Sequence, residues 1–215
     1  VKSIIILKKE KPNLALGFGG YVSFPISFIS FFFKIPLFIY ENNLTIGRAN
    51  KYLLPFAKKI LVAKKIVKNF PNKYKTKYCE VGEILNKDII NYFNFKKDNK
   101  KEKLSILVLG GSQGAKIFGK IVPPAIRELK KKGYTLEVNQ QCTKDQKNSI
   151  SQYYEENSIT NNIFEFDSNI LKLLLSTDLA ITRCGASTTA ELAYTRTPFI
   201  AVPLPYSIDN HQHLN

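Results

Sequence analysis

Short runs dominated by apolar residues recur along the chain and alternate with segments of helical character. The runs are bounded by Gly, Pro, Asn or Lys and predict strands at 14–16, 36–40, 59–63, 104–109, 134–139, 162–166, 177–181 and 198–203. Those at 14–16, 104–109 and 198–203 are expected to be buried. Helices are predicted at 22–34, 47–54, 144–157 and 168–175, and after the glycine turns at 110–114 and 185. Such an alternation predicts an α/β fold with parallel, doubly wound sheets.

Residues 86–103 interrupt the alternation, because they are rich in Lys and Asn and hold no sustained apolar run. We interpret residues 87–103 as a linker with a helical start. It separates a predicted Rossmann-like domain at 1–86 from a second one at 104–215. The sequence contains no Met, opens on Val1 and stops at Asn215, directly after a polar cluster. We therefore expect an internal piece of a longer protein, with both domains incomplete.

The chain is strongly basic, with a formal net charge of +15 at pH 7. Arginine occurs only at positions 48, 127, 183 and 196, so lysine carries most of this charge. No aromatic-basic RNA motif or zinc-ligand spacing accompanies the lysines, and we expect no nucleic-acid partner. An anionic membrane surface is the better match for the charge.

Three cysteines, at 79, 142 and 184, are scattered singly along the chain. They form no CxxC pair, so the sequence predicts neither a zinc site nor a disulfide framework. This cysteine usage is typical of a protein in a reducing cytoplasm, and we expect no metal.

The sequence GGSQGA at 110–115 follows a predicted strand and opens a predicted helix. Gly110 and Gly111 let the backbone approach an anion, and Ser112 and Gln113 add donors at a helix N-terminus that favours phosphate. The loop lacks both the GxGxxG spacing and the lysine of a P-loop, so neither NAD nor ATP fits it well. A tightly packed helix cap is the structural alternative.

A second polar helix start follows Gly185. Its first turns carry Ser187, Thr188, Thr189 and Glu191. A carboxylate there suits the two hydroxyls of a ribose. The structural alternative is that Glu191 is simply an exposed glutamate on a helix. Further polar residues follow the run at 198–203, namely Asp209, Asn210, His211 and Gln212. Because ligands of α/β proteins bind at strand carboxyl ends and helix N-termini, this layout predicts a nucleotide-sugar site.

Four motifs together resemble the MurG family of bacterial N-acetylglucosaminyltransferases of peptidoglycan synthesis. They are GFGGYVSFP (17–25), YENNLTIGRANKYL (40–53), GGSQGAKIFGKIVP (110–123) and the stretch 182–215. The resemblance implies two Rossmann-like domains in the GT-B glycosyltransferase architecture. It also favours the tail of a helix at 3–10, where β-branched residues alone would suggest a strand.

The resemblance implies an inverting enzyme without a cofactor. It would move N-acetylglucosamine from UDP-N-acetylglucosamine to undecaprenyl-pyrophosphoryl-N-acetylmuramyl pentapeptide, converting lipid I to lipid II. The implied UDP-sugar-binding residues are Asn43, Ser112, Gln113, Gly114, Ala186, Ser187, Thr188, Thr189, Glu191, His211 and Gln212. The implied acceptor-side residues are Gly19, Gly20, Tyr21 and Glu41. A glycine turn and a loop cap are the structural alternatives for 17–21 and 40–43. We expect the general base in a missing N-terminal part, and an inactive fragment.

Two positions depart from the family pattern. Tyr40 stands where the family usually has a histidine, which puts any histidine role at that position in doubt. Asn86, followed by Lys87, stands where the family tends to place an arginine near the donor. Lysine supplies positive charge but cannot reproduce the guanidinium fork.

The aromatic-rich segment 26–33 is too short to cross a bilayer, which takes about twenty residues. Phe31 falls where the resemblance implies an apolar patch that meets the membrane. We expect Phe28, Phe31 and Phe32 to insert shallowly, with basic support, at the cytoplasmic face of the bacterial inner membrane. A buried helix is the alternative.

Two other function classes stay open. One is a different enzyme of the same architecture, such as a UDP-N-acetylglucosamine 2-epimerase or a lipid galactosyltransferase. An epimerase needs carboxylates and histidines aimed at the sugar ring, and this chain has only two histidines, both at its end. The other is a non-catalytic basic module that binds membranes or nucleic acid, whose affinity would collapse with salt and ignore UDP.

Overall fold

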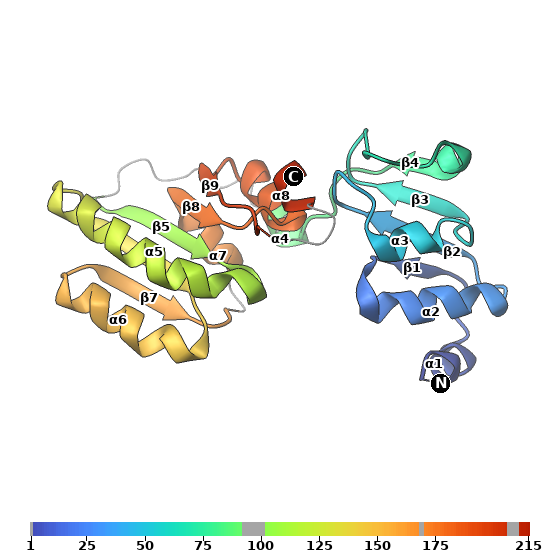
Figure 1. Ribbon diagram of the computed structural model, residues 1–215, viewed down its shortest axis with the longest axis horizontal. Helices are drawn as coiled ribbons and strands as arrows, with labels where there is room; N and C mark the ends of the chain where they lie inside the picture. Colours follow the sequence, from blue (N-terminus) through green and yellow to red (C-terminus); the bar gives the residue numbers. More distant parts are fainter. Residues whose placement is uncertain (1, 92–101, 168–169, 206–210) are drawn as a thin grey trace. The chain divides into compact units, whose positions relative to one another are not determined.

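The computed structural model describes residues 2–91, 102–167, 170–205 and 211–215, without the side chains of residues 112–115 and 211 (Figure 1). The chain forms two compact units, one of Val1–Ile84 with Tyr206–Asn215 and the other of Leu85–Pro205. Each unit contains its own sheet, and every neighbouring pair of strands within the two sheets is parallel. The predicted α/β fold with parallel sheets is confirmed.

The first unit is built on four strands in the order β1-β2-β3-β4. They are β1 (Ala15–Gly17), β2 (Leu37–Glu41), β3 (Lys59–Val62) and β4 (Tyr78–Glu80). The helices are α1 (Lys2–Glu10), α2 (Gly20–Phe32), α3 (Arg48–Leu53), the 3₁₀ helix η1 (Asn72–Lys77) and the C-terminal α9 (His211–Leu214). The central strands β2 and β3 contribute Leu37, Ile39, Ile60 and Val62 to the buried core.

Helix α2 has sequence signals at both ends. Gly19 and Gly20, with φ of 78° and 77°, form the turn that leads out of β1, a conformation that other residues rarely adopt. At the other end Lys34 takes a left-handed φ of 57° and Pro36 follows, so the helix stops before β2 begins. The predicted turn-helix-strand order is therefore present, with the helix two residues earlier and the strand one residue later than expected.

The second unit is built on five strands in the order β7-β6-β5-β8-β9. They are β5 (Leu104–Leu109), β6 (Leu136–Gln141), β7 (Thr160–Phe164), β8 (Leu179–Thr182) and β9 (Phe199–Ala201). The helices are α4 (Lys87–Asn91), α5 (Gly111–Lys131), η3 (Lys144–Gln146), α6 (Lys147–Glu156), α7 (Ile170–Ser176) and α8 (Ala186–Tyr194). This order reverses direction at β5, the usual place for a ligand in such sheets.

Alternate residues of β5 pack into two separate cores. Ile106 and Val108 contact the cluster that contains Phe118 of α5 and Tyr154 of α6. Leu107 belongs to the other cluster, with Leu174 of α7 and Leu192 of α8. Because successive side chains of a strand point to opposite faces, helices cover both faces of this sheet, and the unit is doubly wound.

Three details differ from the sequence predictions. The run at 198–203 was expected to be a buried strand, but β9 is an edge strand whose residues are exposed, Ile200 by 52%. Strand β1 is also an edge strand, and Leu16 on it is exposed rather than buried. The periodicity predicted neither η1 nor β4, because residues 72–80 hold no apolar run.

The division into units also differs from the predicted domains, since α9 packs with the first unit rather than with residues 104–205. The helical start expected after residue 86 is α4, and residues 92–101 lie outside the described part of the chain. Among the described residues, no helix is both long enough and apolar enough to cross a bilayer.

Candidate functional site

The starts of α5 and α8 lie at one edge of the second sheet. Strands β5 and β8 are parallel neighbours, with Leu109 paired to Thr182, and Arg183 N–H donates to the Leu109 carbonyl at 3.2 Å. The chain enters α5 just after β5 and enters α8 just after Gly185. The two predicted nucleotide segments therefore meet at the carboxyl ends of the strands, where parallel sheets bind ligands.

Helix α5 begins at Gly111, whose φ is 61°. Gly110, the residue before the helix, has no side chain and provides no cap. Instead the Gln141 side chain accepts a hydrogen bond from Gly111 N–H at 3.1 Å. Ser112, Gln113 and Gly114 occupy the first turn of the helix, and their side chains lie outside the described atoms.

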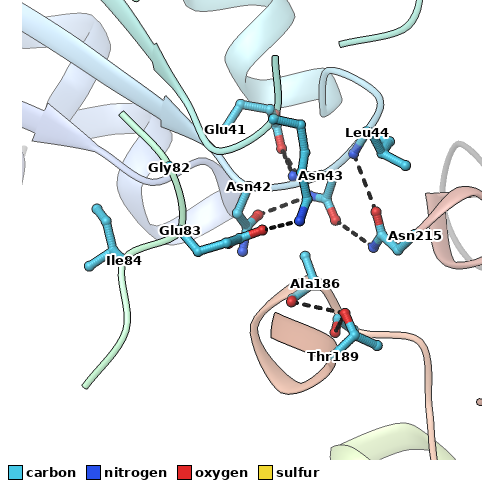
Figure 2. A network of polar contacts seen from close by, with 12 residues as sticks. Glu41, Asn42, Asn43, Leu44, Gly82, Glu83, Ile84, Ala186, Thr189 and Asn215 are labelled. Carbon is cyan, nitrogen blue, oxygen red and sulfur yellow. Dashed lines mark hydrogen bonds and ion pairs between the residues drawn. The ribbon is translucent and has the colours of Figure 1, made fainter. Parts of the chain in front are cut away.

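A side chain of α8 itself forms hydrogen bonds with the backbone at the start of this helix. Thr189 Oγ1 donates toward the carbonyls of Gly185 and Ala186, at 3.0 Å each, and Figure 2 shows the contact with Ala186. Ala186 is buried, Thr188 is partly buried and Ser187 is exposed. Thr189 therefore fixes the helix start, and its oxygen can still accept a hydrogen bond from a ligand.

Glu191 is half-buried on α8, five residues after Ala186. Among the described residues, none forms a hydrogen bond or an ion pair with its carboxylate. Burial alone raises the pKa of this carboxyl above its usual range. A desolvated carboxylate without a protein partner is suited to accept hydrogen bonds from a ligand.

The first unit contains a pocket of about 640 Å³ next to the turn between β1 and α2. Four predicted acceptor-side residues, Gly19, Gly20, Tyr21 and Glu41, and the predicted donor residue Asn43 all line it. The other lining residues are Phe18, Phe24, Pro25, Thr45, Gly47, Arg48, Ala49, Asn50 and Tyr52. The structure thus brings together five predicted residues from two separate motifs.

Glu41 organises the loop at one side of this pocket. One carboxylate oxygen accepts from the backbone and side-chain N–H groups of Asn43, at 3.1 and 2.9 Å. The other accepts from Gly47 N–H at 2.8 Å and from Asn50 Nδ2 at 3.0 Å. Figure 2 shows Glu41 beside Asn43. Four internal donors make the buried Glu41 a fixed anchor for the loop.

Two buried lining residues were missed by the sequence predictions. Asn50 donates from Nδ2 to the Tyr40 carbonyl and to Glu41, while its Oδ1 has no hydrogen-bond partner among the described residues. The same part of the chain offers no partner to the buried Thr45 Oγ1. Gly19 approaches the Asn50 amide so closely that a Cβ there would lie 3.2 Å from Nδ2. Both missed residues lie inside the motif at 40–53, but the resemblance assigned neither of them a role.

Helix α9 contains His211 and Gln212, and Asn215 follows it. Asn215 Oδ1 accepts from Leu44 N–H at 3.3 Å, and Asn215 Nδ2 donates to Asn43 Oδ1 at 3.1 Å (Figure 2). Asn43 is therefore held by both Glu41 and Asn215. The sugar-reading roles of His211 and Gln212 stay predictions, and Asp209 and Asn210 lie outside the described residues.

Comparison with known proteins identifies the family. Residues 105–215 match the glycosyltransferase family 28 C-terminal domain, and residues 1–62 match the family 28 N-terminal domain. The chain belongs to glycosyltransferase family 28.

Similar proteins include several named UDP-N-acetylglucosamine–N-acetylmuramyl-(pentapeptide) pyrophosphoryl-undecaprenol N-acetylglucosamine transferase. The protein of this name from Pelagibacter ubique is 39% identical over the whole of this chain, which spans 59% of the relative's length. The Rickettsia canadensis protein is 38% identical, and the chain spans 61% of it. The chain thus covers about three fifths of the curated relatives that it matches.

Solved structures agree with this assignment to family 28. Acinetobacter baumannii MurG superposes with a TM-score of 0.71 at 28% identity, over 99% of this chain and 59% of MurG. The UDP-N-acetylglucosamine 2-epimerase of Neisseria meningitidis, solved with UDP-N-acetylglucosamine, reaches a TM-score of 0.65 at 15% identity, over 93% of this chain and 62% of the epimerase. The second likeness concerns the fold alone.

The two departures from the family pattern have structural roles here. Tyr40 packs edge-on against Phe18, and its hydroxyl donates to the Gly82 carbonyl and accepts from Ile84 N–H, at 3.2 Å each. Burial is the main cause that raises the pKa of the Tyr40 hydroxyl. Asn86 Oδ1 accepts from Asp88 N–H at 3.0 Å and so caps α4, a role for which asparagine is well suited.

The aromatic residues of α2 divide between two environments. Phe28 is partly buried against Phe24 and Phe56 of the first core. Phe31 and Phe32 are exposed by 48% and 65%. The alternative of a fully buried helix is therefore wrong for the last turn of α2, while the predicted membrane contact stays a prediction.

Proposed function

We propose that the protein transfers N-acetylglucosamine from UDP-N-acetylglucosamine to the muramyl sugar of an undecaprenyl-pyrophosphoryl pentapeptide. The observation that carries the proposal is the shared edge of β5 and β8, where two glycine-led helices begin and Glu191 offers an unpaired carboxylate. The names of the family 28 relatives support the same donor and acceptor.

The second unit supplies the donor side. Backbone N–H groups in the first turn of α5 and the positive end of the helix dipole suit the diphosphate. In the first turns of α8, Ser187, Thr188 and Thr189 offer hydroxyls, and Glu191 accepts hydrogen bonds from the ribose diol. Together these two sets of contacts bind a nucleoside diphosphate and require no metal ion.

The first unit supplies the acceptor side. Its pocket combines aromatic walls, such as Phe18 and Tyr52, with buried polar atoms of Glu41, Asn50 and Thr45. A sugar offers the same combination of apolar faces and hydroxyls. The unpaired Asn50 Oδ1 and Thr45 Oγ1 are suited to the hydroxyl or amide donors of a bound sugar.

The reaction makes three physical demands. The acceptor hydroxyl oxygen bonds to the anomeric carbon, and the bond from that carbon to the diphosphate breaks, its electron pair leaving on UDP with inversion of configuration. The start of α5 stabilises the charge that develops on the departing diphosphate. Transfer also requires that the acceptor hydroxyl and the anomeric carbon be held in line. The hydroxyl proton passes to a base, which we assign to no described residue.

We also propose peripheral attachment to the cytoplasmic face of the membrane through the exposed end of α2. Phe31 contacts Phe32 and Phe56 edge-on, so the exposed rings form one continuous aromatic surface. Lys34 lies two residues after the end of α2, and Lys58 lies two residues after Phe56. Aromatic rings with neighbouring lysines suit shallow insertion into an anionic bilayer.

Donor recognition is tested by calorimetric titration of the purified protein with UDP and with ADP. We expect UDP to bind more tightly, and Glu191→Ala to weaken UDP binding by about 1.5 to 3 kcal/mol, the range for a hydrogen bond to a charged group. The matched control, Glu156→Ala on the exposed face of α6, leaves the affinity unchanged. Equal affinity for UDP and ADP would contradict the proposed donor.

A further inference from the structure

Gln141 lies at the carboxyl end of β6, and its side-chain amide joins three neighbouring strand ends. Its Oε1 accepts a hydrogen bond from Gly111 N–H, two residues beyond β5, at 3.1 Å. Its Nε2 donates to the carbonyl of Glu165, the residue after β7, at 3.2 Å. Since β6 lies between β5 and β7, the amide acts as a brace across this edge of the sheet.

The brace also caps α5. The first four N–H groups of an α-helix lack partners within the helix, and a side chain at the preceding residue usually accepts one of them. Gly110 holds that position and provides no such side chain. Gln141, thirty residues after Gly111 in the sequence, accepts the hydrogen bond of the Gly111 N–H instead.

We propose that Gln141 is a positioning residue for donor binding: it fixes the first turn of α5 for the diphosphate and adds no charge there. The inference rests on the proposed function, which places the diphosphate at this turn. Gln141 acts through the α5 backbone, and we assign it no contact with the substrate.

The choice of an amide at position 141 follows from two requirements. A carboxylate at a helix N-terminus is favourable for the helix, because it complements the positive end of the dipole. The same negative charge would oppose an anionic ligand at that end. An amide caps the helix without the charge, and unlike a carboxylate it also has the N–H donor that reaches Glu165.

Diphosphate positioning and simple bracing predict different results for Gln141→Glu. If Gln141 were only a brace, the variant would alter folding stability and would change UDP and uridine binding alike. If Gln141 positions the helix end for an anion, Gln141→Glu keeps the cap but weakens UDP binding more than uridine binding. The loss also shrinks as salt is raised, because screening weakens the repulsion between the new carboxylate and the diphosphate.

The experiment measures dissociation constants for UDP and uridine with the wild-type protein, Gln141→Glu and Gln152→Glu. Gln152 lies on the exposed surface of α6, so its variant makes the same chemical change away from the helix start. We expect Gln141→Glu to weaken UDP binding at least about fivefold more than uridine binding, with a smaller difference at high salt. The control should show no selective loss.

A wild-type protein that does not prefer UDP over ADP would overturn the proposed function. The role of Gln141 alone would be overturned by a different result. In that case the wild type prefers UDP over ADP, but Gln141→Glu weakens UDP binding relative to uridine binding no more than Gln152→Glu does. If Gln141→Glu does not fold by circular dichroism, the comparison moves to Gln141→Leu and Gln152→Leu. Gln141→Leu should then lose UDP affinity relative to uridine, and an equal loss for both ligands would refute the proposal.

Discussion

Glu191 is a carboxylate held where burial acts against its charge. Its raised pKa means that the folded chain binds this proton more tightly than the unfolded chain does. The free energy of unfolding therefore falls as pH rises through the window above the usual glutamate value. At neutral pH the ionised carboxylate destabilises the empty protein, which is a common feature of binding residues.

The fall in the free energy of unfolding with rising pH leads to the first prediction. Glu191→Gln should raise the free energy of unfolding at pH 7, by less than about 1 kcal/mol because the group is only half-buried. The difference from wild type should vanish when the pH falls below the usual glutamate pKa, where both side chains are neutral. Urea denaturation at several pH values measures this, and a variant less stable than wild type at pH 7 would count against it.

The affinity for UDP should depend on pH in the direction opposite to that of the free energy of unfolding. Ribose hydroxyls donate to the ionised carboxylate, so UDP affinity should fall as the pH is lowered through the raised Glu191 pKa. In Glu191→Gln this fall should be absent, although the affinity is lower throughout. Titrations of both proteins with UDP across the mildly acidic range make the comparison, and parallel pH profiles would remove Glu191 from the ribose site.

Tyr40 shows how a departure from the family pattern acquires a new role. Its hydroxyl makes two hydrogen bonds to the segment Gly82–Ile84. Tyr40→Phe should lower the free energy of unfolding by about 1 to 2 kcal/mol, since each bond contributes roughly 0.5 to 1.5 kcal/mol. Tyr21→Phe is the matched control, because Tyr21 is 89% exposed and should tolerate the change. Equal stability of the two variants would show that the Tyr40 bonds contribute nothing.

At the scale of elements, α2 links the pocket to the exposed aromatic surface. Its first turn, with Gly20 and Tyr21, lines the pocket, while Phe31 and Phe32 lie at its other end. One helix thus connects a candidate acceptor site with a candidate lipid surface, as a lipid-linked acceptor requires.

Phe31→Asp should reduce co-sedimentation of the protein with anionic liposomes and leave UDP binding intact. The control is Tyr134→Asp, which adds the same charge at an exposed aromatic residue of the second unit. Unchanged liposome binding by Phe31→Asp would mean that this end of α2 does not meet the membrane.

Most of the elements could be predicted, because buried strands such as β5 and glycine-led helices such as α5 follow local patterns. Edge strands were harder, since β9 has the composition of a buried strand and its exposure depends on its place in the sheet. The roles of Asn50 and Gln141 could not be predicted, because they depend on how the chain folds back on itself. Asn50 bonds Glu41 across a loop, and Gln141 bonds Gly111 on a neighbouring element.

At the scale of the whole molecule, the two units divide the chemistry. The second unit contains the glycine-led helices and Glu191, and the first contains the pocket and the aromatic surface. The positive charge is not confined to either unit, since lysines occur throughout the chain. Family 28 membership and the layout of each unit favour a sugar transferase over a nucleic-acid binder.

The most direct test of the central claim is a transfer assay with the purified full-length protein, labelled UDP-N-acetylglucosamine and a soluble lipid I analogue. We predict a β-linked disaccharide product, released UDP, no product with ADP-linked sugar, and strongly reduced turnover in Glu191→Ala. Conversion of UDP-N-acetylglucosamine to its C2 epimer without transfer, or equal use of UDP- and ADP-linked sugars, would contradict the account.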